Sequence, residues 1–145
     1  MRKYHAPMRI YLVCPVRKRT PEQQADLDEW VTSCEQEFGH EVYYPGRDTG
    51  VAEAPENATG ITACNIHHIQ IANEVHVYYE PGSTGSLFDL GVAWALNKPI
   101  ALVNPIQIKQ YADAGDAWAI LLLERVRRSE YGREPGLEDK GRIDE

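Results

Sequence analysis

Long hydrophobic runs are missing from this sequence of 145 residues. A membrane-spanning helix needs roughly 18 to 20 uninterrupted apolar residues, and no stretch of the chain comes near that length. The apolar segment near the N-terminus ends at Pro15, which suits a buried strand and not a signal segment. We therefore expect no membrane contact and a cytoplasmic location. The length predicts one ordinary domain.

Cysteine and metal-binding patterns are equally sparse. The three cysteines, Cys14, Cys34 and Cys64, are an odd number with wide spacing, which indicates neither a disulfide framework nor a Cys-x-x-Cys motif. The five histidines form no His-Glu-x-x-His pattern and no His/Cys ligand spacing. The Gly-x-Ser-x-Gly motif of a nucleophilic serine is missing too. We therefore expect no metal, no cofactor and a reducing compartment.

Basic residues are outnumbered in this chain. The 15 Lys and Arg residues stand against 22 Asp and Glu, which gives a formal net charge of −7. A protein that binds nucleic acid needs a net basic face for the phosphates, so we expect no nucleic-acid partner. The one basic cluster, Arg17 to Arg19, follows a predicted strand and precedes a predicted helix. It is either a solvated loop or a site for an anion.

The sequence does contain short apolar runs that alternate with amphipathic segments. Thr20, followed by Pro21 and acidic residues, marks the start of the first helix, and Gly39 marks its end. The stretch 47–60 is rich in Gly, Pro and Asn without periodicity and predicts a loop. Strands are expected at 8–15, 40–46, 74–79 and 98–104, and helices at 20–39, 60–73, 83–97 and 115–132.

The alternation of strands with helices implies βαβ units, a parallel sheet and helices on both of its faces. Such sheets bind ligands just beyond the carboxyl ends of their strands. This rule marks four places: the turn after Cys14, the loops after Tyr44 and Tyr79, and the turn near Asn104. A pair of tyrosines ends both the second and the third strand. Alternate residues point to opposite faces, so one tyrosine of each pair lines a pocket there or fills the core.

The segment PGSTGS, residues 81–86, leaves a strand and enters a helix. Its glycines allow close backbone approach, its hydroxyls can form hydrogen bonds, and the helix start offers free amides and a favourable dipole for an anion. It lacks the Gly-Lys-Ser/Thr ending of a P-loop and the Gly-x-Gly-x-x-Gly dinucleotide fingerprint. Asp89 follows in the first or second helical turn. There it either complements the helix dipole or faces a ligand.

Three segments in order carry a resemblance: IYLVCPVR, ITACNIHHIQIANEVHVYY and PGSTGSLFDLGVAWALNKPI. Over about residues 8–104 the chain resembles the nucleoside 2-deoxyribosyltransferase family and its relatives, the nucleoside 5′-monophosphate N-glycosidases. The resemblance implies a flavodoxin-like (Rossmann-like) three-layer sandwich with a parallel sheet of about five strands. The domain would span 1–132, followed by a flexible charged tail at 133–145. The resemblance also implies a homodimer or higher homo-oligomer, and cleavage or transfer at the bond between a base and its (deoxy)ribose.

The resemblance assigns three catalytic positions. The family's nucleophilic carboxylate falls on Asp89, and the tyrosine that positions it falls on Tyr11. The family's second acidic residue, which is implicated in protonating the leaving base, falls on Asn65. Asp89 is one methylene shorter than the family's glutamate, and an amide cannot donate a proton at neutral pH.

The missing acid has two candidate replacements on the same predicted helix, His67 and His68. A histidine titrates in the right range. Adjacent helical positions lie about 100° apart, so at most one of the two shares the face of Asn65. Either histidine could instead be a surface or packing residue, and a substrate with a good leaving base would need no protein acid.

Substrate contacts are also implied by the resemblance. The phosphate-contacting arginine of the family falls on Arg17 and the loop serine on Ser83, and Gly85 and Ser86 complete that loop. The expected ligand is a nucleoside or its 5′-monophosphate, and Arg17 favours the monophosphate.

Three kinds of protein remain open. An enzyme would use the Asp89 carboxylate at the anomeric carbon. A catalytically impaired nucleotide-binding protein would hold the same ligand without turnover, and the changes at Asp89 and Asn65 are what such a history would leave. A structural protein would assemble through Trp94 or Trp118, although helix aromatics usually fill a core or a dimer interface. We favour cleavage or transfer, because the other assigned positions keep the family's residue types.

Overall fold

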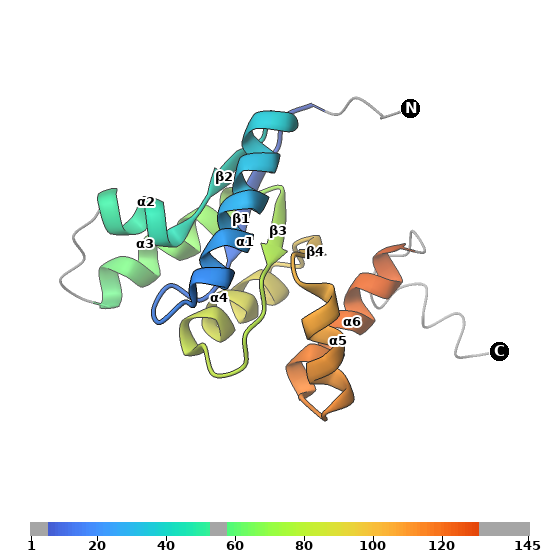
Figure 1. The fold of residues 1–145 in the computed structure, drawn as a ribbon. Helices are drawn as coiled ribbons and strands as arrows, with labels where there is room; N and C mark the ends of the chain where they lie inside the picture. The colour runs from blue at the N-terminus through green and yellow to red at the C-terminus, as the bar shows by residue number, and fades with distance from the viewer. Residues whose placement is uncertain (1–5, 53–57, 131–145) are drawn as a thin grey trace.

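The computed structural model describes residues 6–52 and 58–130, and Figure 1 shows how strands and helices alternate along them. The strands are β1 (Arg9–Val13), β2 (Glu41–Tyr43), β3 (Glu74–Val77) and β4 (Ile100–Leu102). The helices are α1 (Pro21–Thr32) with a π-helical continuation (Ser33–Glu37), α2 (Pro45–Ala52), α3 (Ala58–Ile71), α4 (Thr84–Ala95), α5 (Pro105–Asp113) and α6 (Ala117–Glu130). The expected tail at 133–145 lies outside the described residues.

The sheet is parallel throughout and has the strand order β2-β1-β3-β4. Tyr11 in β1 pairs in register with Tyr43 in β2 and with Val75 in β3. The α/β, flavodoxin-like architecture is confirmed, but the strand count is corrected, since the described residues form four strands and not about five. After the edge strand β4, the described chain forms α5 and α6, which pack against each other instead of adding a strand.

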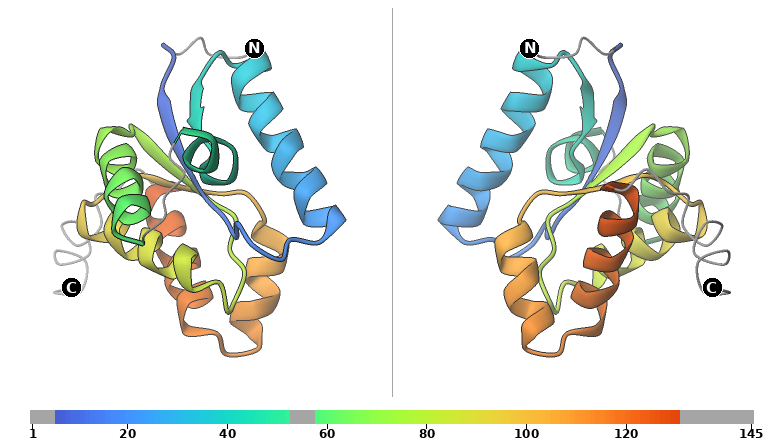
Figure 2. Two further views of the ribbon diagram at one scale, coloured as in Figure 1. Left: turned by 90° about the vertical axis from the view of Figure 1, so that its left-hand side faces the viewer. Right: turned by 90° about the vertical axis from the view of Figure 1, so that its right-hand side faces the viewer.

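Alternation along β1 separates two cores. Ile10 and Leu12 pack with α1, whereas Tyr11 and Val13 pack with α3 and α4, because successive side chains of a strand point to opposite faces. Figure 2 shows α1 on one side of the sheet and α3 and α4 on the other. The two tyrosine pairs divide in the same way, as expected: Tyr44 and Tyr78 pack in the core with α1, and Tyr43 and Tyr79 in the core with α3 and α4.

A capping box fixes the start of α1. Thr20 Oγ1 accepts a hydrogen bond from the Gln23 N–H at 3.1 Å, and Gln23 Oε1 accepts one from the Thr20 N–H at 3.0 Å. Pro21 occupies the first helical position, where no N–H is required. Gly39 follows the π-helical segment with a φ of 71°, a left-handed backbone that favours glycine. The predicted start and end of this helical region are confirmed.

The predicted loop over 47–60 is wrong. Pro45–Ala52 form α2, and α3 begins at Ala58. Pro45 opens the helix without needing an N–H, and Asp48 Oδ2 accepts a hydrogen bond from the Tyr44 N–H at 2.8 Å. Residue types that usually mark a turn therefore start a helix here. The sequence also predicted no element over the stretch that forms α5.

The described ranges contain no helix that is both long and apolar enough to cross a membrane. The three cysteines are free thiols, with Cys14 and Cys34 buried and Cys64 half-buried. Buried thiols of this kind pack as small apolar side chains.

Candidate active site

Asp89 lies in the second turn of α4 and is only 8% exposed. Its Oδ2 accepts a hydrogen bond from the Tyr11 hydroxyl at 2.8 Å. Tyr11 is fully buried in the middle of β1, and Leu90, beside Asp89, is packed in the core between α4 and the sheet. The carboxylate therefore points toward the sheet. A carboxylate that only complements a helix dipole needs neither burial nor a hydrogen bond from the sheet, so the dipole alone does not explain the position of Asp89.

Burial and hydrogen bonding act in opposite directions on the Asp89 carboxyl. Burial has the larger effect and raises its pKa to about 6, while hydrogen bonds from Tyr11 and Asn65 lower it. The group is consequently mostly ionised at neutral pH and becomes protonated in mild acid. Burial, and then the nearby Asp89, raise the pKa of Tyr11 far above its usual range, so the Tyr11 hydroxyl stays a hydrogen-bond donor.

Asn65 meets Asp89 from α3. Its side chain is buried and hydrogen-bonds the Asp89 carboxyl, which is one of the contacts that lower the pKa of that group. Three elements that are far apart in the sequence thus bring together Tyr11, Asn65 and Asp89, the three residues expected at the catalytic position. At the position where the resemblance implied a second acid, the chain has an amide that donates to the Asp89 carboxylate.

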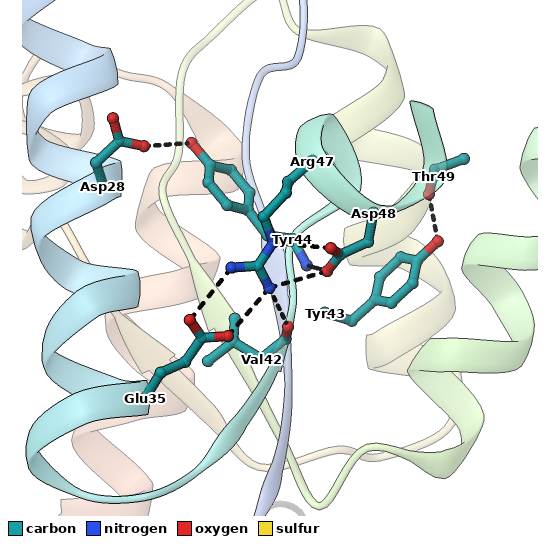
Figure 3. Close-up of polar contacts among 8 residues, drawn as sticks. All are labelled: Asp28, Glu35, Val42, Tyr43, Tyr44, Arg47, Asp48 and Thr49. Carbon is teal, nitrogen blue, oxygen red and sulfur yellow. Dashed lines mark hydrogen bonds and ion pairs between the residues drawn. The ribbon is translucent and has the colours of Figure 1, made fainter. Parts of the chain in front are cut away.

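Thr49 in α2 extends this buried cluster, and it was not among the residues expected at the site. Its Oγ1 donates a hydrogen bond to Asn65 Oδ1 at 3.1 Å, and the side chain is 5% exposed. The Tyr43 hydroxyl forms a hydrogen bond with Thr49 Oγ1, as Figure 3 shows, and lies 3.1 Å from Cys64 Sγ. The one usable signal was the rule that ligands bind beyond the carboxyl ends of strands, because it marked the loop after Tyr44.

The small-residue loop after β3 ends at the start of α4. Ser83 Oγ donates a hydrogen bond to Ser86 Oγ at 2.8 Å, so its hydroxyl does not cap the helix backbone. Ser86 is buried, whereas Gly85 is exposed. Gln23 Nε2 donates to Glu80 Oε2 at 3.0 Å and thereby ties the loop to the first turn of α1. The loop lies just before the helix that carries Asp89.

The basic cluster after β1 is divided by the fold. Arg17 and Lys18 are exposed in the turn before α1, and the structure brings neither into a described contact with the Asp89 cluster. Arg19 turns inward, donates to Gln24 Oε1 at 3.0 Å and lies over the Tyr44 ring at 5.2 Å. Of the three basic residues, only Arg17 and Lys18 offer an exposed charge to an anion.

The turn near Asn104, another expected ligand site, is used by the fold itself. Asn104 Oδ1 accepts a hydrogen bond from the Tyr79 N–H at 2.9 Å, and Asn104 Nδ2 donates to the Tyr79 carbonyl at 2.9 Å. This side chain therefore closes the ends of β3 and β4 together. Both ends of its amide are therefore engaged by the backbone of Tyr79.

Of the two candidate histidines, His68 is on the side of Asn65. Its ring stacks on Tyr43 with centroids 3.7 Å apart, and burial, with a smaller contribution from His67, lowers its pKa. A lowered pKa leaves the imidazole mostly neutral at pH 7, which weakens its case as a proton donor. His67 is exposed. No group of three or more His, Cys, Asp and Glu that could hold a metal occurs among the described residues.

Two surface cavities on the described part of the chain are not lined by Asp89. One of about 530 Å³ lies between β2, α2 and α3 and is lined by Tyr43 and His68 among others. The other, of about 350 Å³, lies between α1 and α5. The cavities and the buried cluster of Asp89, Tyr11 and Asn65 therefore indicate different candidate sites. We assign the site by the chemistry, because a buried carboxylate whose pKa is strongly shifted and which has specific donors is characteristic of a functional site.

Comparison with known proteins identifies the fold and the family. The fold defines an α/β protein, and the buried carboxylate marks a candidate site at the helix after the third strand. The family model for nucleoside 2-deoxyribosyltransferase matches residues 10–124. The chain belongs to the nucleoside 2-deoxyribosyltransferase family. No curated protein matches it.

Solved structures resemble the chain in fold. A 2-deoxyribosyltransferase from Bacillus psychrosaccharolyticus superposes with a TM-score of 0.54 at 24% identity, covering 65% of this chain and 70% of that one. A 2-deoxyribosyltransferase from Leishmania mexicana has a TM-score of 0.49 at 20% identity and covers 66% and 63%. The first of these supports the flavodoxin-like fold and no finer conclusion.

Proposed function

We propose that this protein breaks the N-glycosidic bond of a nucleoside or nucleoside 5′-monophosphate, with Asp89 as the nucleophile at the anomeric carbon. The observation that carries the proposal is the 2.8 Å hydrogen bond between the Tyr11 hydroxyl and the buried Asp89 carboxylate. Family membership supports the reaction class, since the family acts at N-glycosidic bonds.

The chemistry has two displacements. The Asp89 carboxylate oxygen forms a bond to the anomeric carbon while the bond from that carbon to the base nitrogen breaks, and the bonding electron pair leaves with the base. Solvent protonates the departing base, because Asn65 has no proton to give. Water or a second base then attacks the same carbon and releases Asp89. Water as acceptor gives hydrolysis and a base gives transfer.

The shorter acidic side chain sets a geometric condition. Aspartate retracts the carboxylate by about 1.5 Å relative to glutamate, and a misplacement of about 1 Å can cost roughly 100-fold in rate. The buried contacts from Tyr11 and Asn65 support a fixed position of the carboxylate. We therefore propose slow turnover that depends on a base that leaves easily.

Substrate binding is proposed at the loop of Ser83, Gly85 and Ser86 together with Arg17. The start of α4 presents backbone N–H groups to an anion, and the exposed Arg17 can add a positive charge. This pairing favours a 5′-phosphate over an uncharged sugar end. We also propose a homodimer or higher homo-oligomer as the working unit.

A panel of nucleosides and 5′-monophosphates tests the proposal. Each is incubated with the purified protein, and free base is measured by chromatography. We expect base release from wild type, loss of roughly 1,000-fold or more in Asp89→Ala, and no loss in Asp113→Ala. Asp113 is the matched control, because its carboxylate is 68% exposed in an ion pair on α5.

The alternative is a catalytically impaired nucleotide-binding protein of the same fold. It is favoured by one observation, namely that both family carboxylates are changed, to Asp89 and Asn65. Saturable binding of a nucleotide without base release, together with release restored by Asn65→Asp combined with Asp89→Glu, would establish this alternative and reject turnover by the natural chain.

A further inference from the structure

We propose that Thr49, held by Tyr43, is a positioning residue that fixes the orientation of the Asn65 amide and thereby keeps Asp89 supplied with a hydrogen-bond donor. This inference rests on the proposed role of Asp89 in catalysis, although its test does not require turnover. Thr49 was not expected at the site, and Tyr43 was expected only as one of a tyrosine pair that lines a pocket or fills the core. The hydrogen bonds of Thr49 and Tyr43 go to each other, to Asn65 and to Cys64, and not to the carboxylate.

The directions of the hydrogen bonds follow from which atoms can donate. Asn65 Oδ1 can only accept, so the Thr49 hydroxyl must give its single proton to that oxygen across 3.1 Å. Thr49 Oγ1 then has no proton left for Tyr43, and the Tyr43 hydroxyl must donate to Thr49. In turn the Cys64 thiol is the donor across its 3.1 Å contact with the Tyr43 oxygen. Every donor in this chain points toward Asn65.

The same chain decides which end of the amide meets the carboxylate. With Oδ1 engaged by Thr49, the Nδ2 group is the end of Asn65 that hydrogen-bonds Asp89. A flipped amide would set its carbonyl oxygen against the carboxylate, which is repulsive, and the Thr49 hydroxyl would then have to accept from the NH₂ group instead of donating to Oδ1. Asp89 thus receives donors from both sides, Tyr11 and Asn65.

The groups around Asp89 are uncharged, so the hydrogen bond from the Asn65 amide has a clear effect on the pKa of Asp89. From β1 the titratable group that faces it is the Tyr11 hydroxyl. The Cys14 thiol, just beyond that strand, interacts with Asp89 electrostatically, but burial raises the pKa of Cys14 to about 12, so it adds no charge. From α3 the facing group is the Asn65 amide. Behind it, burial raises the pKa of Tyr43 to about 12, which keeps its proton available to Thr49. A second carboxylate at position 65 would instead oppose ionisation of Asp89.

Helix α2 is anchored so that Thr49 keeps its place without a ligand. Arg47 donates to both oxygens of Glu35 at 3.2 and 3.0 Å and to the Val42 carbonyl at 2.9 Å. Asp48 accepts from Arg47 at 2.7 Å and from the Tyr44 N–H at 2.8 Å. Figure 3 shows this network on one side of α2 and Thr49 on the other, beside Tyr43.

Titration of the Asp89 side-chain carboxyl by ¹³C NMR tests the inference directly. Wild type, Thr49→Val and Thr49→Ser are compared, and an Asp89→Asn spectrum identifies the resonance. We expect Thr49→Val, which keeps the shape and removes the hydroxyl, to shift the midpoint upward by about one pH unit, because the amide is no longer locked. Thr49→Ser keeps a hydroxyl and should restore the wild-type midpoint.

Tyr43→Phe is the second variant, in case Thr49→Val does not fold. It removes the donor behind Thr49, frees the threonine hydroxyl to turn, and should shift the midpoint in the same direction by a smaller amount. Wild-type midpoints in both folded variants would overturn the inference. A shifted midpoint in a protein that releases no base would uphold the positioning role and reject the proposed function. Base release with unshifted midpoints would reject the positioning role alone.

Discussion

At the scale of single residues, the balance at Asp89 decides what the site can do. Burial pushes its pKa up to about 6, and the donors Tyr11 and Asn65 oppose that change. A nucleophile needs the ionised form, so the donors support reactivity at neutral pH while burial raises the energy of the charge. The result is a carboxylate that is charged at physiological pH and poorly solvated.

The first prediction concerns Tyr11→Phe. Removing the hydroxyl deletes a hydrogen bond that lowers the pKa of Asp89, so the acid limb of base release, expected near pH 6 in wild type, should move upward by about one unit. The measurement is the pH dependence of initial rates. Tyr79→Phe is a suitable control, because the Tyr79 hydroxyl bonds Asp116 and not Asp89. An acid limb that stays in place in Tyr11→Phe would contradict the assigned role.

The second prediction concerns stability. The pKa of Asp89 is about 6 in the folded state against 3.8 for the free group, so the folded protein binds this proton more tightly than the unfolded chain. Its protonation stabilises the fold below pH 4, and that contribution is lost as the pH rises through about 6. Asp89→Asn should therefore be more stable than wild type by about 3 kcal/mol at pH 7 and similarly stable near pH 4.

Urea unfolding at the two pH values measures this difference. Equal stability of wild type and Asp89→Asn at pH 7 would mean that the buried carboxylate carries no energetic cost. The expected gain in stability with loss of base release is the usual trade-off at a functional site.

The sequence could place some of these residues and not others. Tyr11, Asn65 and Asp89 could be assigned because the motifs of the family carry them, and the fold brings them together. Thr49 and Tyr43 could not, because their contacts join residues on separate elements and depend on the angle at which α2 meets the sheet. Arg17 was expected at the ligand and stays a prediction; the structure leaves Arg17 exposed and turns Arg19 inward.

At the scale of elements, α2 is the segment on which the account depends most. The sequence predicted a loop there, because PGRDTG combines Pro, Gly and Asp, which are typical turn formers. The helix forms because Asp48 satisfies a backbone N–H at its start and Arg47 ties it to Glu35 and Val42 (Figure 3). Contacts between residues that are distant in the sequence cannot be predicted from the local helix or turn preferences of the residues. By contrast α1 was predictable, since its capping box lies within four consecutive residues.

The third prediction tests this anchoring. Arg47→Gln should lower the free energy of unfolding by about 1 kcal/mol and reduce base release, because α2 and Thr49 lose a fixed position. Arg9→Gln is the matched control, since the Arg9 and Glu41 side chains are 60% and 78% exposed and 3.8 Å apart, and we expect a change within about 0.5 kcal/mol. Denaturant unfolding and the chromatographic assay give both readouts. If Arg47→Gln and Arg9→Gln changed the free energy of unfolding and base release equally, the proposed anchoring role of Arg47 would be contradicted.

At the scale of the whole molecule, the parallel sheet explains why the site forms where it does. The order β2-β1-β3-β4 puts β1 and β3 in the centre, and α3 and α4 cover the same face, so residues from β1, α3 and α4 converge. The alternation of strands and helices in the sequence was sufficient to predict this architecture. The number of strands was not, because the resemblance implied about five and the described chain forms four.

The fourth prediction concerns assembly. Trp118 and Leu121 are 49% and 43% exposed on α6, and they lie three residues apart on one side of the helix. Exposed large apolar groups on a chain with a net charge of −7 suggest a buried contact between copies. Trp118→Lys should therefore convert the proposed oligomer to monomer in sedimentation experiments, whereas Lys109→Gln on α5 should not. A wild-type protein that sediments as a monomer would contradict this expectation.

The central claim is that the Asp89 carboxylate bonds to the anomeric carbon. The most direct measurement mixes the protein with a nucleotide labelled in its sugar, quenches in acid at short times and maps the label by mass spectrometry of peptides. The account predicts a sugar adduct on the peptide that contains Asp89, formed at the rate of base release and missing in Asp89→Ala. Continued base release from Asp89→Ala at the wild-type rate, with no labelled peptide, would contradict it.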